Sequence, residues 1–181
     1  MAATKAVNIT LLDASPRLTM ETASVHGKVR TFIDTVAVTG TDFDADGDYV
    51  VLAEVPSNAK ILSIKLFNDD LDSGTDMAPN VGIYNGPTKF TSSTPTTYAA
   101  DGIIDEDCYA SAITTFQTAN TTGVEVSFEA RNINAINNYV WEDAGLPEDP
   151  GVQLRIVATQ TATVGGVATG DISVVVEYVS E

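Results

Sequence analysis

Cysteine and histidine are almost absent from this chain, and their scarcity excludes most disulfide, metal-binding and cysteine- or histidine-based catalytic functions. Among 181 residues there is one cysteine, Cys108, so no intrachain disulfide can form. The single histidine, His26, lies far from Cys108 in the sequence. No Walker loop, H-E-x-x-H or paired C-x-x-C motif occurs. We therefore expect no catalytic residue, no cofactor and no metal, and we predict that the protein is not an enzyme.

Basic residues are also few. The chain has 9 Lys and Arg against 25 Asp and Glu, which gives a net charge of −16. Such a surface repels phosphate, so nucleic acid is not expected as a partner. It also repels anionic membranes, and no apolar run approaches the ~18 residues that a membrane-spanning helix needs. The first residues lack the continuous apolar core of a signal peptide.

The charge is distributed unevenly along the chain. Residues 1–31 carry +2, and residues 32–181 carry −18. We predict that residues 1–31 form an extended N-terminal arm that lies on a neighbouring molecule, and that residues 32–181 form the folded body. The alternative is a disordered tail. The residues expected to bind the partner are Val7, Ile9, Leu11, Arg17, Lys28 and Arg30.

One stretch, "DFDADGDYV" at residues 42–50, looks like the start of a calcium-binding loop. Asp42, Asp44 and Asp46 alternate before Gly47, as in an EF-hand. The twelfth position, which should be a bidentate Glu, is Ala53. Because both flanks are β-branched sequences typical of strands, we interpret the stretch as a polar turn between strands.

Short strands joined by polar loops dominate the predicted secondary structure. The spacing predicts strands at residues 7–12, 32–38, 48–55, 60–67, 80–84, 124–130, 152–158 and 171–179. In the fourth strand Leu62, Ile64 and Leu66 should share one face. In residues 124–130 the odd positions Glu125, Ser127 and Glu129 should face outward, with the apolar even positions, including Phe128, inward. The fold class predicted is an all-β antiparallel sandwich, similar to a jelly roll, with little helix.

Two segments favour helix. Residues 104–119, "IDEDCYASAITTFQTA", have acids in the first turn, which suits the helix dipole. Residues 140–151 predict one helical turn that is closed by Gly145, with Trp141 packed inward.

Three stretches carry a resemblance to a known group of proteins. They are "DADGDYVVLAEVPSNAKILSIKLFND" (44–69), "NVGIYNG" (80–86) and "YVWEDAGLPEDPGVQLRIVAT" followed by "GDISVVVEYV" (139–179). Together they resemble head decoration, or cement, proteins of tailed bacteriophages, and "WEDAGLPEDPG" is their most specific element. Residues 1–41 lie outside the resemblance.

The resemblance implies a virion structural protein on the outer capsid surface, which binds the major capsid protein and stabilises contacts between capsid subunits. We also expect the protein to bind itself, as a homodimer or homotrimer. Two alternatives stay open at this point: a tail, neck or fibre protein of the virion, or a carbohydrate-binding or adhesin sandwich. A carbohydrate-binding or adhesin sandwich needs an exposed aromatic platform, and the chain has one Trp.

Overall fold

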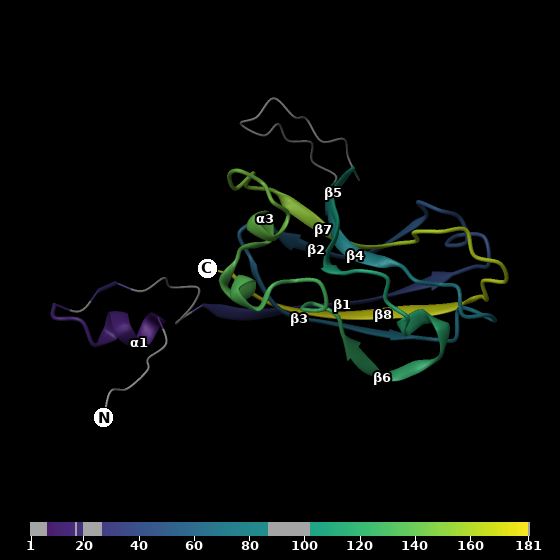
Figure 1. Ribbon diagram of the computed structural model, residues 1–181, viewed down its shortest axis with the longest axis horizontal. Helices are drawn as coiled ribbons and strands as arrows, with labels where there is room; N and C mark the ends of the chain where they lie inside the picture. Colours follow the sequence, from purple (N-terminus) through teal and green to yellow (C-terminus); the bar gives the residue numbers. More distant parts are fainter. Residues whose placement is uncertain (1–6, 17, 20–26, 87–101, 181) are drawn as a thin grey trace.

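Strand pairing organises this chain into two antiparallel sheets. The computed structural model describes residues 7–16, 18–19, 27–86 and 102–180. Within them, β1 (Lys28–Val38), β8 (Gly170–Ser180), β3 (Lys60–Asn68) and β6 (Asn120–Glu125) form one sheet in that order. The other sheet has the order β2 (Tyr49–Pro56), β7 (Gln153–Thr159), β4 (Asn80–Asn85) and β5 (Ile103–Ala110). The two sheets form the lower and upper layers in Figure 1.

The connectivity is that of a jelly roll. Strand β1 pairs with β8, β2 with β7, β3 with β6 and β4 with β5, as if one long hairpin were wrapped around a barrel axis. This confirms the predicted antiparallel sandwich. The short helical segments are α1 (Val7–Leu12), η1 (Thr115–Gln117), η2 (Ile133–Asn137) and α3 (Val140–Asp143).

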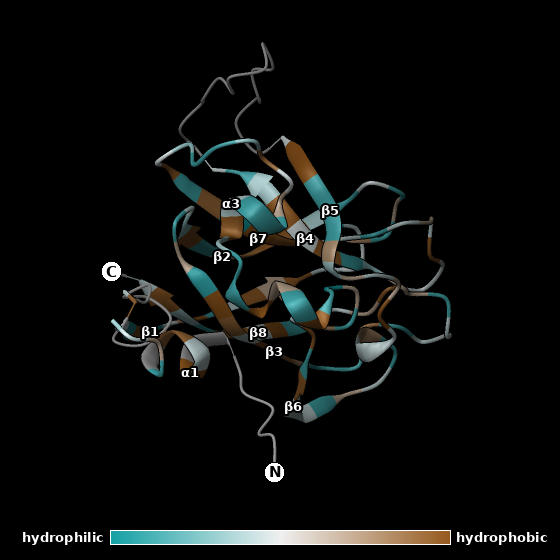
Figure 2. Ribbon diagram, turned by 60° about the vertical axis from the view of Figure 1, so that its left-hand side comes forward, coloured by the Kyte–Doolittle hydropathy of each residue, from teal (hydrophilic) through white to brown (hydrophobic). Residues whose placement is uncertain are grey.

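The core lies between the two sheets and follows from period-2 alternation. In β8, the buried residues Ile172, Val174 and Val176 alternate with more exposed neighbours. Leu154 and Ile156 of β7 are buried opposite them. Figure 2 shows the hydrophobic residues concentrated along the strands, while the loops are mostly hydrophilic.

The turn at residues 42–48 forms as predicted. Gly47 has a φ of +85°, a conformation that favours glycine. The carboxylate of Asp42 accepts hydrogen bonds from the backbone N–H (2.9 Å) and hydroxyl (2.6 Å) of Thr39, and these bonds lower the pKa of Asp42. Asp48 accepts a bond from the Ala45 N–H at 2.8 Å. These two carboxylates therefore hold the turn itself.

The structure also confirms the helical turn at α3. Gly145 follows it with a φ of +67°, and the N–H of Leu146 donates to the carbonyl of Trp141 at 3.0 Å. Trp141 is half-buried and packs against the core. The carboxylate of Glu142 accepts the N–H of Tyr139, which closes the start of the turn.

The prediction of a strand at residues 7–12 was wrong, because these residues form α1. A strand needs a neighbour to satisfy its backbone groups, whereas a helix bonds to itself. In Figure 1, α1 stands apart from the sandwich, and its backbone groups bond within the helix. The alternation of Val7, Ile9 and Leu11 in the sequence therefore does not lead to a strand.

The prediction of a helix at residues 104–119 was also wrong. Residues 103–110 form β5, which pairs with β4. The pairing depends on Gly82, where an added Cβ would lie 2.2 Å from the carbonyl oxygen of Asp105. This close approach comes from tertiary structure, which overrides a local preference for helix.

Two errors concern which face a residue occupies. The register of β3 shifts between Ile61 and Ser63, so Leu62 is the extra residue of a bulge and is 40% exposed. Ile64 and Leu66 do share one face, as predicted, and both are fully buried.

The predicted strand 124–130 instead ends at Glu125, the last residue of β6. The Glu125 carboxylate accepts the backbone N–H of Ser127 at 2.9 Å and the N–H of Ile64 at 2.9 Å. Ser127, expected outward, is therefore buried.

Candidate interaction surface

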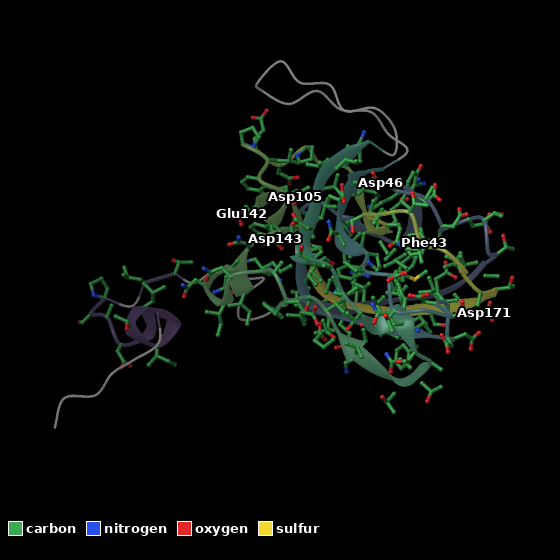
Figure 3. All side chains as sticks on the ribbon, turned by 45° about the vertical axis from the view of Figure 1, so that its right-hand side comes forward. Phe43, Asp46, Asp105, Glu142, Asp143 and Asp171 are labelled. Carbon is green, nitrogen blue, oxygen red and sulfur yellow. The ribbon has the colours of Figure 1, made fainter. Side chains whose placement is uncertain are left out.

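One end of the sandwich collects features suited to binding. Lys28, the first residue of β1, pairs with Ser180, and Lys60, the first residue of β3, pairs with Val179. The α3 turn joins them there, since the N–H of Val140 donates to the carbonyl of Ala59 at 2.8 Å. We call this the arm end, because the chain enters β1 here (Figure 1). Figure 3 places Glu142 and Asp143 toward this end and Asp171 at the other.

An apolar groove of about 340 Å³ opens on the arm end. Its lining residues are Phe128, Arg131, Ile133 and Ile136. Ile133 is 80% exposed and Ile136 is 52% exposed. Two large aliphatic side chains displayed side by side on η2 are unusual for a surface that faces only water, and such patches mark interaction sites.

Arg131 forms the floor of this groove and fixes its shape. Its side chain is buried, and its guanidinium pairs with the carboxylate of Asp143 through Nη2–Oδ2 at 2.9 Å and Nε–Oδ1 at 3.1 Å. Nη1 donates to the carbonyl of Ile61 at 3.3 Å, and Nη2 donates to that of Ala135 at 2.7 Å. The guanidinium also lies 4.9 Å from the ring centroid of Phe128. One side chain thus ties β3, η2 and α3 together.

Burial dominates the electrostatics beneath the groove. It raises the pKa of Asp143 to about 6, although Arg131 and a hydrogen bond from Asn138 act in the opposite direction. Burial also raises the pKa of the Cys108 thiol well above its usual range, and the nearby carboxylate of Asp105 adds to this effect. The thiol therefore stays protonated, as expected for a structural cysteine.

The predicted partner-binding residues are distributed over two elements. Val7, Ile9 and Leu11 belong to α1, and Ile9 is 46% exposed while Leu11 is half-buried. Lys28 and Arg30 lie in β1, which begins inside the segment predicted as the arm. Both are exposed, and Nε of Arg30 donates to Oγ of Ser180 at 2.7 Å. The remaining residue, Arg17, lies outside the described residues.

The groove itself was missed from the sequence. Its two isoleucines lie in "RNINAINNY", where single apolar residues are separated by asparagines without strand alternation. Phe128 was predicted inside a strand. An aliphatic pair three residues apart in an Asn-rich loop is the signal that could have pointed to an exposed turn of helix.

No group of three or more His, Cys, Asp or Glu side chains is placed to hold a metal ion within residues 7–16, 18–19, 27–86 and 102–180. In the same ranges, no helix combines the length and the apolar character required to span a bilayer.

Comparisons with known proteins give a structural match alone. No protein-family model matches the sequence, and no curated protein matches it. A solved structure titled "Capsid of Ralstonia phage GP4" contains a chain with the same fold, with a TM-score of 0.58 and 20% identity over 86% of each chain. A chain of the "Cyanophage Pam1 capsid asymmetric unit" aligns over 100% of both chains at 20% identity, with a TM-score of 0.49. At this identity, the first match shows a shared fold.

Proposed function

We propose that this chain is a structural protein of a tailed-phage virion that decorates the outer capsid surface and stabilises contacts between capsid subunits. The observation that carries the proposal is the fold shared with a chain of the Ralstonia phage GP4 capsid over 86% of both molecules. The match spans nearly the whole of each chain, so it concerns an entire module of similar size. The sequence resemblance to decoration proteins supports the same assignment.

The charge distribution favours the outer surface. The body carries −18 outside residues 1–31, so a position against packaged DNA would be repulsive. On the outside, the acidic surface faces solvent and keeps the particles dispersed.

We place the contact with the major capsid protein at the arm end. The groove of Phe128, Ile133 and Ile136 offers apolar area, and the exposed Lys28 offers positive charge beside a body that carries −18. An apolar centre with a charged rim is the usual composition of a protein interface.

The first test is the amount of the protein in purified virions, measured by quantitative mass spectrometry. Decoration predicts a copy number that is comparable with, or a simple fraction of, that of the major capsid protein. A handful of copies per particle would instead support a tail, neck or fibre protein, and absence from the virion would refute both.

The second test locates the contact. The double variant Ile133→Asp/Ile136→Asp should weaken binding to undecorated capsids about tenfold or more, equivalent to ~1.4 kcal/mol. Ile103→Asp is the matched control, because Ile103 is 54% exposed but lies on β5, outside the groove. Equal binding by the double variant and the control would show that the groove is not the contact.

A further inference from the structure

Strand β1 leaves one side of the first sheet unpaired within the described residues. It is the outermost strand in the order β1-β8-β3-β6. All 11 of its residues pair with β8 without a register shift. It contains no proline and no bulge, two of the devices that protect a sheet edge from other chains, and its charged residues are Lys28, Arg30 and Asp34. Val29 and Ile33 on it are 62% and 70% exposed.

The hydrogen bonds show which residues of β1 face the open side. In β8, Asp171 bonds toward β3, since its carbonyl accepts the N–H of Asp69 at 3.0 Å. Because backbone groups alternate along a strand, the even-numbered residues of β8 face β1. They pair with the even-numbered residues of β1. The N–H and C=O groups of the odd-numbered residues of β1 therefore point away from the sheet. They belong to Val29, Thr31, Ile33, Thr35 and Ala37.

A local contact agrees with this assignment. The N–H of Thr35 donates to Oδ1 of its own neighbour Asp34 at 2.8 Å. An N–H engaged in the ladder with β8 would not be available to that carboxylate. Asp34 lies on the same face of β1 as Lys28 and Arg30, since all three are even-numbered.

We propose that β1 pairs in antiparallel fashion with β1 of a second copy of this chain, about a two-fold axis at Phe32. The edge is then self-complementary, as a two-fold interface requires. Arg30 lies opposite the partner's Asp34, and Asp34 lies opposite the partner's Arg30. Opposite charges on directly facing residues stabilise an antiparallel pair.

This register also satisfies the free backbone groups. Thr31 and the partner's Ile33 face each other as a hydrogen-bonded pair, as do Val29 and the partner's Thr35. In the dimer, the N–H of Thr35 no longer donates to the carboxylate of Asp34 and donates to the carbonyl of the partner's Val29 in its place. The carboxylate of Asp34 is then free to bind the partner's Arg30, so one rearrangement satisfies both groups.

In a neighbouring register, an axis at Thr31 would place Lys28 opposite the partner's Asp34. That register leaves Arg30 facing the partner's Phe32, and it overlaps only residues 28–34 of the strand. The axis at Phe32 overlaps residues 28–36 and places the two half-buried Phe32 side chains opposite each other, so their exposed parts can form a cross-strand aromatic pair. The longer overlap and the aromatic pair favour Phe32.

Sedimentation equilibrium of the purified full chain tests the dimer in solution, independently of any capsid. Arg30→Asp and Asp34→Arg should each weaken dimerisation about tenfold or more, because each creates like charges at two symmetric positions. The double variant Arg30→Asp/Asp34→Arg, called the double swap, should return the dissociation constant of the dimer to within about threefold of the native value. Lys65→Asp and Glu177→Arg carry the same charge changes on the exposed surfaces of inner strands, and they should have little effect.

Two outcomes would overturn the proposal. One is a native chain that stays monomeric at millimolar concentration. The other is a double swap that fails to recover while Lys28→Asp/Asp34→Lys does, which would move the axis to Thr31.

Disulfide trapping gives an independent measure of the register. In a Cys108→Ala background, Phe32→Cys should form a disulfide dimer on mild oxidation, since facing residues of a non-hydrogen-bonded pair have Cα atoms about 4.5 Å apart. Thr31→Cys and Ile33→Cys are the controls and should cross-link poorly, because neither faces itself. Preferential cross-linking by Thr31→Cys would refute the axis at Phe32, and no cross-linking by any of the three would refute the pairing.

Discussion

Replacement of Arg131 by Met tests whether one buried ion pair holds the arm end together. The Arg131 and Asp143 side chains are each 2% exposed, and their closest contact is 2.9 Å. Methionine keeps much of the volume and the apolar contact with Phe128. It leaves the Asp143 carboxylate buried without a cation, and it removes the donor to the carbonyl of Ala135.

The expected loss in the free energy of unfolding is about 3–5 kcal/mol, the usual effect of removing one partner of a buried pair. Most of it comes from the uncompensated charge on Asp143. The loss should be large enough to measure and still leave a folded protein if the native free energy of unfolding is in the ordinary range of about 5–15 kcal/mol.

Arg155→Met is the matched control. Arg155 also pairs with a carboxylate, that of Glu54, but at 3.4 Å and with side chains 23% and 36% exposed. Solvent screens such a pair, so its removal should change the free energy of unfolding by no more than about 1 kcal/mol.

The effect of Arg131→Met should depend on pH. In the native protein, burial raises the pKa of Asp143 from 3.8 to about 6, so its protonation favours the folded state. That contribution is complete below pH 3.8 and is lost as pH rises through about 6. Without Arg131 the folded pKa rises further, because the neighbouring positive charge is gone. The destabilisation should therefore be larger at pH 8 than at pH 5.

Urea denaturation followed by circular dichroism at pH 5 and pH 8 measures both effects. A loss for Arg131→Met that is no greater than that for Arg155→Met would refute the structural role of the pair. A loss that grows on acidification would refute the assignment of the effect to the Asp143 charge.

Three further outcomes are expected. Gly82→Ala should reduce the free energy of unfolding in urea by about 3 kcal/mol or more, because the new Cβ would lie 2.2 Å from backbone atoms of Asp105 and Glu106; a loss below about 1 kcal/mol would show that β5 moves away easily. Millimolar calcium against excess EDTA should shift the thermal midpoint by less than about 2 °C, since the turn at residues 42–48 lacks a closing Glu. Deletion of residues 2–27 should leave the thermal midpoint within about 2 °C, because every strand of the sandwich begins at Lys28 or later; a larger fall would show that the segment stabilises the body.

The sequence predicted the fold class because alternation is a local signal. In β8, Ile172, Val174 and Val176 are spaced by two, and all three are buried. The turn at Gly47 and the helical turn before Gly145 were predicted for a similar reason, since each depends on a glycine with positive φ within a few residues.

The errors occur where a distant partner decides the structure. Residues 104–119 have acids suited to a helix start, but β4 pairs with part of this segment as a strand, and Gly82 allows the close approach. Residues 7–12 alternate like a strand, yet they pair with no strand among the described residues. The local sequence pattern carries no information about where a pairing strand lies in the fold. Neither the strand at residues 103–110 nor the helix at residues 7–12 was therefore predictable.

The candidate site was least predictable for the same reason. Arg131 and Asp143 are only 12 residues apart, but their pairing depends on how η2 and α3 fold back onto β3. The exposure of Ile133 and Ile136 is a result of that packing. The proposed arm, by contrast, rested on charge, and its division from the body at residue 31 stays a prediction, although β1 begins at Lys28.

The two proposals have a joint consequence, because antiparallel pairing at β1 turns the arm ends of the two copies in opposite directions. A dimer would then present two apolar grooves at its far ends, which suits a protein that bridges neighbouring capsid subunits. Two linked contacts bind more tightly than one, by a factor of about 10²–10⁴ where the geometry allows both. Arg30→Asp should therefore weaken capsid binding by far more than a single lost charge would, and the swap with Asp34→Arg should restore it. Binding by Arg30→Asp that matches the native chain, measured where the variant is monomeric, would show that the capsid contact does not need the dimer.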